Sequence, residues 1–200
     1  MKKKFIILIV LLSMVILTLP LTAGKPQTAA GSKSVFFGFN GLSNLSVEDS
    51  WIGFQYLFAD KMGLWGSISL TMLTEKPSQA TNDNIKNDFE FDVGFIYYLF
   101  EKGPVACWVS PSIGLGFGST EFEEEDMPLT KISSNLFYAG VSIGAEWFFT
   151  DNVSISADTF LGFQQTGRTT EIQNFKTEYS KTEFGFITGA GASLVLLFYF

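Results

Sequence analysis

The chain has 200 residues, of which 46% are hydrophobic and 16% aromatic, and its formal net charge is −7. This length suits a single domain. Acidic residues outnumber basic ones by 20 to 13, which argues against a nucleic-acid-binding protein. The sequence contains no histidine, so it lacks the most frequent general base at neutral pH and the commonest metal ligand. We therefore expect a protein that is not an enzyme and that holds no metal and no cofactor.

The first 23 residues have the three parts of a secretory signal peptide. Lysines at positions 2–4 precede an apolar core over residues 5–19, which is followed by Pro20 and a small-residue site ending at Ala23. A membrane anchor is the alternative, but the core is shorter than the roughly 18 residues that such a helix needs. We predict a cleaved signal peptide, residues 1–23, and then a polar lead-in, residues 24–32, without structure of its own.

Residues 181–200 show the most extended alternation in the chain. Apolar or small residues recur at every second position up to Phe200, while Glu183, Gly185, Gly189, Gly191 and Ser193 lie on the other face. A period of two predicts a β-strand whose two faces meet different surroundings. The stretch is about twice the roughly 9 to 11 residues with which a tilted strand crosses a bilayer.

Seven earlier segments alternate in the same way. The predicted strands are residues 34–40, 51–59, 64–74, 88–100, 105–118, 135–149 and 153–165. Short turns at 60–63, 101–104 and 150–152 alternate with longer connections at 41–50, 75–87, 119–133 and 166–180. Eight strands with short turns on one side, long loops on the other and both termini on the short-turn side predict an antiparallel up-and-down transmembrane β-barrel. An even number of strands lets the first and last strands pair, so that no edge remains.

The outward side chains favour this barrel over the main alternative, a soluble β-sandwich of eight strands. Outward aromatic residues fall at two heights, Phe39 and Phe117 near the long loops and Tyr97 and Trp147 near the short turns, with aliphatic residues such as Ile143 between. Two aromatic girdles around an aliphatic band match the two interfaces of a bilayer. A sandwich would not need apolar residues this bulky on every strand. We predict an all-β barrel over residues 33–200.

The end of the chain and the order of its elements resemble known proteins. A terminal Phe200, preceded by Phe198 and other apolar residues at two-residue steps, is similar to the assembly signal of bacterial outer-membrane β-barrel proteins. The strands, tight turns and long outer loops resemble the small OmpX-like barrels and the transmembrane domain of the OmpA-like family. The resemblance implies a location in the bacterial outer membrane with both termini in the periplasm. It also implies contact with outer-membrane lipid and lipopolysaccharide, and insertion by the barrel assembly machinery.

Carboxylates at inward positions are the candidate functional residues. Glu90, Asp92, Glu146, Asp158 and Glu183 point inward by parity. A buried charge without a partner is costly, so these groups must be hydrated, hydrogen-bonded or neutralised by cations. The alternative is that Glu90, Asp92 and Glu183 stand above the membrane in water, which would leave only Glu146 and Asp158 inside.

Two aromatic donors are expected beside one of these carboxylates. Pairing about the connection at 119–133 is expected to place Trp108 opposite Glu146, and the turn at Gly103 brings Tyr98 beside Trp108. We expect the indole and the phenol to donate hydrogen bonds to Glu146 and to form a polar plug near the periplasmic end.

An acidic outer loop is the remaining cluster of charge. Its members are Glu121, Glu123, Glu124, Glu125 and Asp126. Oxygen ligands suit divalent cations, but the spacing fits no defined binding loop. A solvated loop is therefore the favoured interpretation, with weak contact to cations or to lipopolysaccharide as the alternative.

Two classes of function remain open. The first is a structural or surface-interaction protein that acts through its extracellular loops, with a ligand that the sequence does not identify. The second is a narrow, cation-favouring channel, or a transporter of small molecules that resembles OmpW-like barrels. The interior of an eight-stranded barrel is about filled by side chains, which favours the first class.

Overall fold

The structure, a computed structural model, describes residues 24–40, 50–75, 84–122, 129–172, 175–186 and 193–200. The predicted signal peptide, residues 1–23, lies outside these ranges. Within them, no helix is long and apolar enough to cross a membrane. The strands are β1 (Lys33–Asn40), β2 (Ser50–Ala59), β3 (Met62–Glu75), β4 (Asn84–Lys102), β5 (Val105–Phe122), β6 (Thr130–Phe148), β7 (Val153–Ile172), β8 (Phe175–Phe186) and β9 (Ser193–Tyr199).

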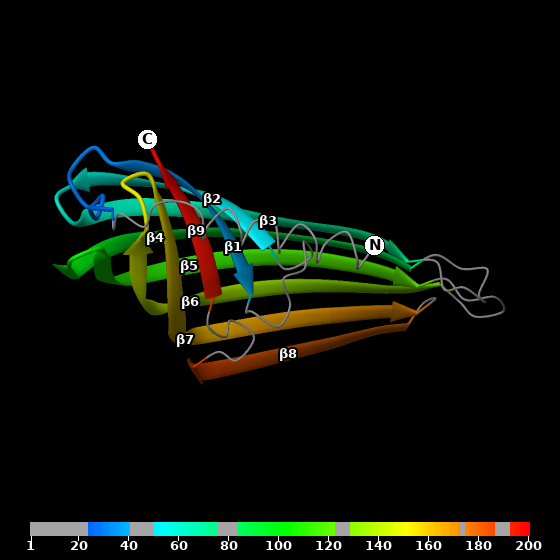
Figure 1. The fold of residues 1–200 in the computed structure, drawn as a ribbon. Helices are drawn as coiled ribbons and strands as arrows, with labels where there is room; N and C mark the ends of the chain where they lie inside the picture. Colours follow the sequence, from blue (N-terminus) through cyan, green and yellow to red (C-terminus); the bar gives the residue numbers. More distant parts are fainter. Residues whose placement is uncertain (1–23, 41–49, 76–83, 123–128, 173–174, 187–192) are drawn as a thin grey trace.

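The strands form a closed antiparallel ring. Each strand from β1 to β7 pairs with the next along the chain, β7 pairs with β9, and β9 pairs with β1. Figure 1 shows β4 to β7 as long, curved ribbons, and β9 runs to the C-terminus at the end of the barrel where the short turns lie. The ring itself contains eight strands, β1 to β7 and β9, and among the described strands β8 pairs only with β7. The prediction of an all-β, eight-stranded antiparallel barrel is confirmed.

The strands at the long-loop end extend further than predicted. Strand β4 begins at Asn84, β5 runs to Phe122, and β6 begins at Thr130. Parts of the predicted loops 75–87 and 119–133 are therefore paired strand, and most of 166–180 belongs to the hairpin of β7 and β8. Alternation stops where both faces of a strand meet water, so these polar extensions carried no period-two signal.

The predicted closing strand, residues 181–200, is not one continuous ladder. Strand β7 pairs first with β8, as in Leu161 with Phe186, and then with β9, as in Asp158 with Ser193. Phe186 and Ser193 are separated by six residues along the chain, whereas their partners on β7, Leu161 and Asp158, are separated by only two. The ring therefore closes through β9, and the register shifts between β8 and β9. Residues 187–192 lie outside the described ranges.

The side chains divide the barrel into an apolar outside and a packed lower interior. Many outward side chains are large, apolar and exposed, and we call them the outer belt: Phe37, Ile52, Phe54, Tyr56, Leu64, Ile68, Leu70, Phe91, Val93, Tyr97, Ile113, Leu115, Phe137, Val141, Ile143, Trp147, Leu161 and Phe198. Near the short turns, inward side chains form a buried cluster, the end layer: Phe36, Leu57, Ile96, Tyr98, Ala106, Trp108, Phe148, Leu197 and Tyr199.

Residues 24–32, the predicted lead-in, form no strand. They are nevertheless held in place by hydrogen bonds to the short-turn end of the barrel. The sequence did not predict these contacts with the barrel.

Candidate functional site in the barrel interior

Glu146 lies at the centre of a hydrogen-bond network within the end layer. Its side chain comes from β6 and is 1% exposed. Tyr98 of β4 donates to Oε2 at 2.7 Å, and Tyr199 of β9 donates to Oε1 at 2.7 Å. The Ser154 hydroxyl of β7 donates to the same Oε1. One carboxylate thus joins side chains from four strands across the lumen.

The network continues to a fifth strand. The amide Nε2 of Gln55, on β2, donates to the Tyr98 hydroxyl at 3.2 Å. Among the ion pairs between described residues, none involves Glu146. Neutral hydroxyl donors, and no described cation, therefore compensate for the loss of hydration of this group.

The expected hydrogen bond from Trp108 to Glu146 is wrong. The actual register places Trp108 opposite Gly144 and places Ala106 opposite Glu146. The indole Nε1 donates instead to Ser156 Oγ at 3.2 Å. The register differs by two residues from the expected one, which moves the indole to the next inward position along the barrel. Tyr98 does lie opposite Trp108, on β4 and β5.

Further from the short turns, the lumen widens into a cavity of about 540 Å³. Carboxylates from β4 and β7 line it, namely Asp88, Glu90, Asp92 and Asp158. Aromatic walls come from Trp51, Trp65, Tyr138 and Phe160. The cavity is therefore acidic and partly aromatic, and the end layer bounds it on the short-turn side.

Most of these carboxylates have hydrogen-bond or ionic partners. Asp92 accepts from Ser67 Oγ at 3.1 Å and from the Tyr138 hydroxyl. Asp158 accepts from the Ser193 hydroxyl. Asp88 forms an ion pair with Lys86 at 2.8 Å.

The two expectations for the inward carboxylates each hold in part. Glu90 and Asp92 line the cavity, which agrees with their inward assignment, while the alternative that placed them above the membrane in water stays a prediction for these two residues. Glu183 lies on β8, where its side chain is 49% exposed and pairs with Lys181 at 2.7 Å. Glu183 is therefore a solvated residue, as that alternative expected.

Only one member of the predicted acidic loop lies in the described ranges. Glu121 belongs to β5 and pairs with Lys131 of β6 at 2.9 Å. This hydrogen bond raises the pKa of the Lys131 ammonium above its usual value. Glu123, Glu124, Glu125 and Asp126 lie outside the described ranges, and within those ranges no group of three or more residues could hold a metal.

The predicted assembly residues end the closing strand. Phe198 points outward and contacts the Phe37 ring edge to face, with centroids 6.2 Å apart. The Phe200 backbone N–H donates to Lys33 O at 3.1 Å, and its side chain is 71% exposed. An exposed terminal ring is available for recognition, but the assembly role stays a prediction.

Solved structures share this architecture. A major outer membrane protein from Thermus thermophilus matches with a TM-score of 0.50 and 14% sequence identity, over 86% of this chain and 100% of that chain. The chain has the fold of an outer-membrane β-barrel. At this identity the match establishes the fold and not the function.

Two further structures of outer-membrane barrels match with lower scores. Ail, the attachment invasion locus protein of Yersinia pestis, has a TM-score of 0.46 and 14% identity, over 85% of this chain and 98% of that chain. The N-terminal β-barrel domain of Pseudomonas aeruginosa OprF has a TM-score of 0.42 and 16% identity, over 86% and 98%. No protein-family model matches the sequence, and neither does any curated protein.

Several polar residues of this outer-membrane barrel were not predicted from the sequence. Tyr199, Ser154 and Gln55 belong to the Glu146 network, and Tyr138 and Ser193 bind the cavity carboxylates. All five occupy inward positions, so parity could have marked them as lumen residues. Parity gives the face of a strand but not the height of a partner on a distant strand, which depends on the register.

Proposed function

We propose that this protein is an outer-membrane β-barrel that interacts with partners at the bacterial surface and does not transport solutes through its lumen. The observation that carries the proposal is the end layer. Its apolar side chains and the Glu146 network fill the lumen where the short turns meet. An interior filled at one end offers no continuous path for a solute.

The outer belt supports insertion into a membrane. Side chains such as Leu70, Leu115 and Ile143 are 58%, 46% and 60% exposed. Soluble proteins rarely expose contiguous apolar patches of more than a few hundred Å². A band of this kind around a closed barrel suits lipid contact, including contact with the lipid portion of lipopolysaccharide.

The outer hairpins support a surface role. The hairpin of β7 and β8 extends to Ile172 and Phe175, and Phe175 and Tyr179 are 78% and 58% exposed. Among the described strands, β8 pairs only with β7. An exposed strand edge flanked by aromatic side chains can accept an extended segment of a partner.

The acidic cavity favours a second candidate, a cation-selective pore. Planar-bilayer recordings of the purified protein under a KCl gradient separate the two. We expect no steady conductance from a barrel closed by the end layer. A cation-selective conductance that Glu146→Gln diminishes would overturn the closed-barrel proposal and support the pore.

Orientation can be tested by thiol labelling in a Cys107→Ser background. Thr177→Cys places a thiol in the exposed part of β8, and Lys102→Cys places one at a short turn. A membrane-impermeant maleimide should label the first in intact cells and the second only after lysis. Labelling of Lys102→Cys alone in intact cells would show that the short turns face outward.

A further inference from the structure

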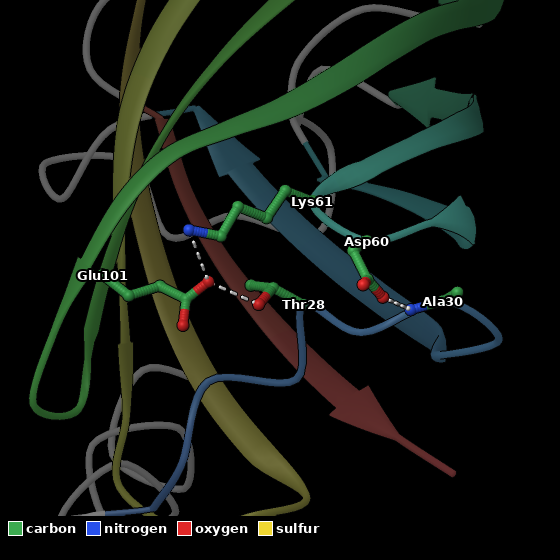
Figure 2. Close-up of polar contacts among 5 residues, drawn as sticks. All are labelled: Thr28, Ala30, Asp60, Lys61 and Glu101. Atoms are coloured by element: carbon green, nitrogen blue, oxygen red, sulfur yellow. Dashed lines mark hydrogen bonds and ion pairs between the residues drawn. The ribbon is translucent and has the colours of Figure 1, made fainter.

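Residues 24–32, which we call the strap, cross the short-turn end of the barrel. The strap bonds beside all three short connections: to β2 and the turn before β3, to Glu101 at the end of β4, and to the end of β6 and the turn before β7. Figure 2 shows its middle and later part beside the first two of these. Strand pairing does not require any of these contacts.

The middle of the strap is fixed by Thr28. Its hydroxyl donates to Glu101 Oε1 at 2.6 Å, and its carbonyl oxygen accepts from the Lys61 backbone N–H at 2.7 Å. Lys61 also pairs with Glu101 through Nζ at 3.5 Å (Figure 2). Thr28 itself is 6% exposed. One threonine thus connects the β2–β3 turn to the end of β4.

The later part of the strap joins β2. The Ala30 N–H donates to Asp60 Oδ1 at 2.9 Å, and the Gly31 N–H donates to Leu57 O at 2.7 Å. Leu57 N–H donates back to Ser32 O at 2.9 Å. Gly31 has φ +90°, a conformation that suits glycine within the turn closed by Ser32 N–H to Ala29 O.

The start of the strap lies against the β6–β7 connection. Gly24 N–H donates to Phe148 O at 3.0 Å, and Lys25 N–H donates to Asp151 Oδ1 at 2.8 Å. A Cβ at position 24 would collide with the Thr150 backbone. This close approach leaves room only for glycine, so the start of the strap packs at a specific position on the β6–β7 connection.

The strap reaches the most buried part of the end layer. Leu57 and Phe148, which it contacts through their backbones, are 0% exposed. Tyr98 is also 0% exposed, and its backbone N–H donates to Lys61 O at 2.9 Å. The strap therefore bonds to two residues of the buried end layer, which also contains Tyr98 and Tyr199, the phenol donors to Glu146.

We propose that residues 24–32 act as a lid that holds the three short connections together and keeps water out of the Glu146 network. The strap bonds to residues of the end layer, where, among the described residues, Glu146 accepts only from neutral hydroxyl groups. Loosening the strap lets the short turns separate and admits water to this network, while the ring of strands persists through its own ladders.

The test measures access to the layer below the strap. Ala106 is 0% exposed and lies opposite Glu146. The Ala106→Cys variant, in a Cys107→Ser background, is purified as the exported protein in detergent micelles. It is then treated with a charged methanethiosulfonate reagent, and the rate of thiol modification is measured. Slow modification is expected with the strap intact, compared with Lys102→Cys at the exposed turn.

Two strap variants should accelerate this modification. Thr28→Val removes the hydroxyl that donates to Glu101, and Gly24→Ala disturbs the seat on Thr150. Each should raise the rate about tenfold or more. Thr28→Val does so because it loses one hydrogen bond to a charged group, and Gly24→Ala because its Cβ clashes with the Thr150 backbone. Two variants at separate contacts keep the test valid if one of them fails to fold, which heat-modifiable gel mobility reports.

Ala30→Ser is the matched control, because the residue is exposed and the change keeps the backbone N–H. It should leave the rate unchanged. Unchanged rates in both strap variants would overturn the proposal. So would equal acceleration by Ala30→Ser, or modification of Ala106→Cys in the parent protein as fast as that of Lys102→Cys.

Discussion

Glu146 accepts three hydrogen bonds in a fully buried site, so the loss of any one donor should be measurable. Tyr98→Phe removes the donor to Oε2 and keeps the ring. We expect it to lower the free energy of unfolding by about 1–3 kcal/mol, the usual cost of leaving a buried hydrogen-bonding group without its partner. Urea unfolding in lipid vesicles measures this. Tyr97→Phe is the control, because Tyr97 points outward and is 40% exposed; a loss as large for Tyr97→Phe would contradict the prediction.

Gly114 provides a second test at single-residue scale. A Cβ there would collide with Asp92 Oδ1 and with the Tyr138 ring, so the glycine leaves room for the hydrogen bond between these two residues. Gly114→Ala should destabilise the barrel by about 1–3 kcal/mol, as overpacking does. At Gly66 the nearest atom to an added Cβ is Asp92 O at 3.4 Å, so Gly66→Ala should cost less. Equal costs would show that the cavity wall adapts.

The sequence predicted which residues point inward but only some of their partners. Alternation placed Glu146, Tyr98 and Trp108 in the lumen, since parity depends only on position along one strand. The indole donor was assigned to the wrong acceptor. An error of two residues in register leaves each side chain on the same face of the sheet but changes which residue of the neighbouring strand lies opposite it. Tyr199 was overlooked although it occupies an inward position next to Phe200.

Among the elements, the hairpin of β7 and β8 is not needed to close the ring. Closure uses β9, which pairs with both β7 and β1. Replacing residues 168–179 with Asn-Gly puts a two-residue turn between the paired residues Gly167 and Ser180. We expect unchanged folded yield in heat-modifiable gel mobility, together with loss of any surface interaction that depends on this hairpin. Loss of the folded form would show that the outer half of β8 supports the ring.

The end of β9 carries the predicted assembly signal. Phe200→Ala should lower the amount of folded barrel in the outer membrane without changing export, because the exposed terminal ring would be missing from recognition. Fractionation and gel mobility measure both quantities. Leu70→Ala, which removes an exposed apolar side chain far from the chain end, is the control. Equal folded yield for Phe200→Ala and the parent protein would contradict the prediction that Phe200 belongs to the assembly signal.

At the scale of the molecule, the outer belt predicts a dependence on lipid. Ile143 is 60% exposed and points outward from β6. Ile143→Lys should cost about 2–4 kcal/mol in vesicles if the residue lies near the bilayer midplane. Thr177→Lys, in the exposed part of β8, should cost little. Similar small costs at both positions, measured by urea unfolding, would place the belt outside lipid.

The closed ring was predictable because every spanning segment alternates between two different solvents. The length of the outer hairpins was not, since strands with water on both faces need no alternation. The strap was missed for a different reason: most of its contacts use backbone N–H and C=O groups. Every residue carries both groups, apart from proline, which lacks the N–H. No pattern of side chains marks such a segment in advance.

The strap also implies an order of events during folding. Its bond from Lys25 to Asp151 joins residues 126 positions apart, and its other partners belong to three separate hairpins. Contacts so distant along the chain form only after the intervening segments are placed, because closing a long loop costs entropy before the contact repays it. We therefore expect the strap, the earliest part of the described chain, to dock last. Protection of the Lys25 and Gly31 amides from hydrogen exchange would then appear only after the ladders have formed.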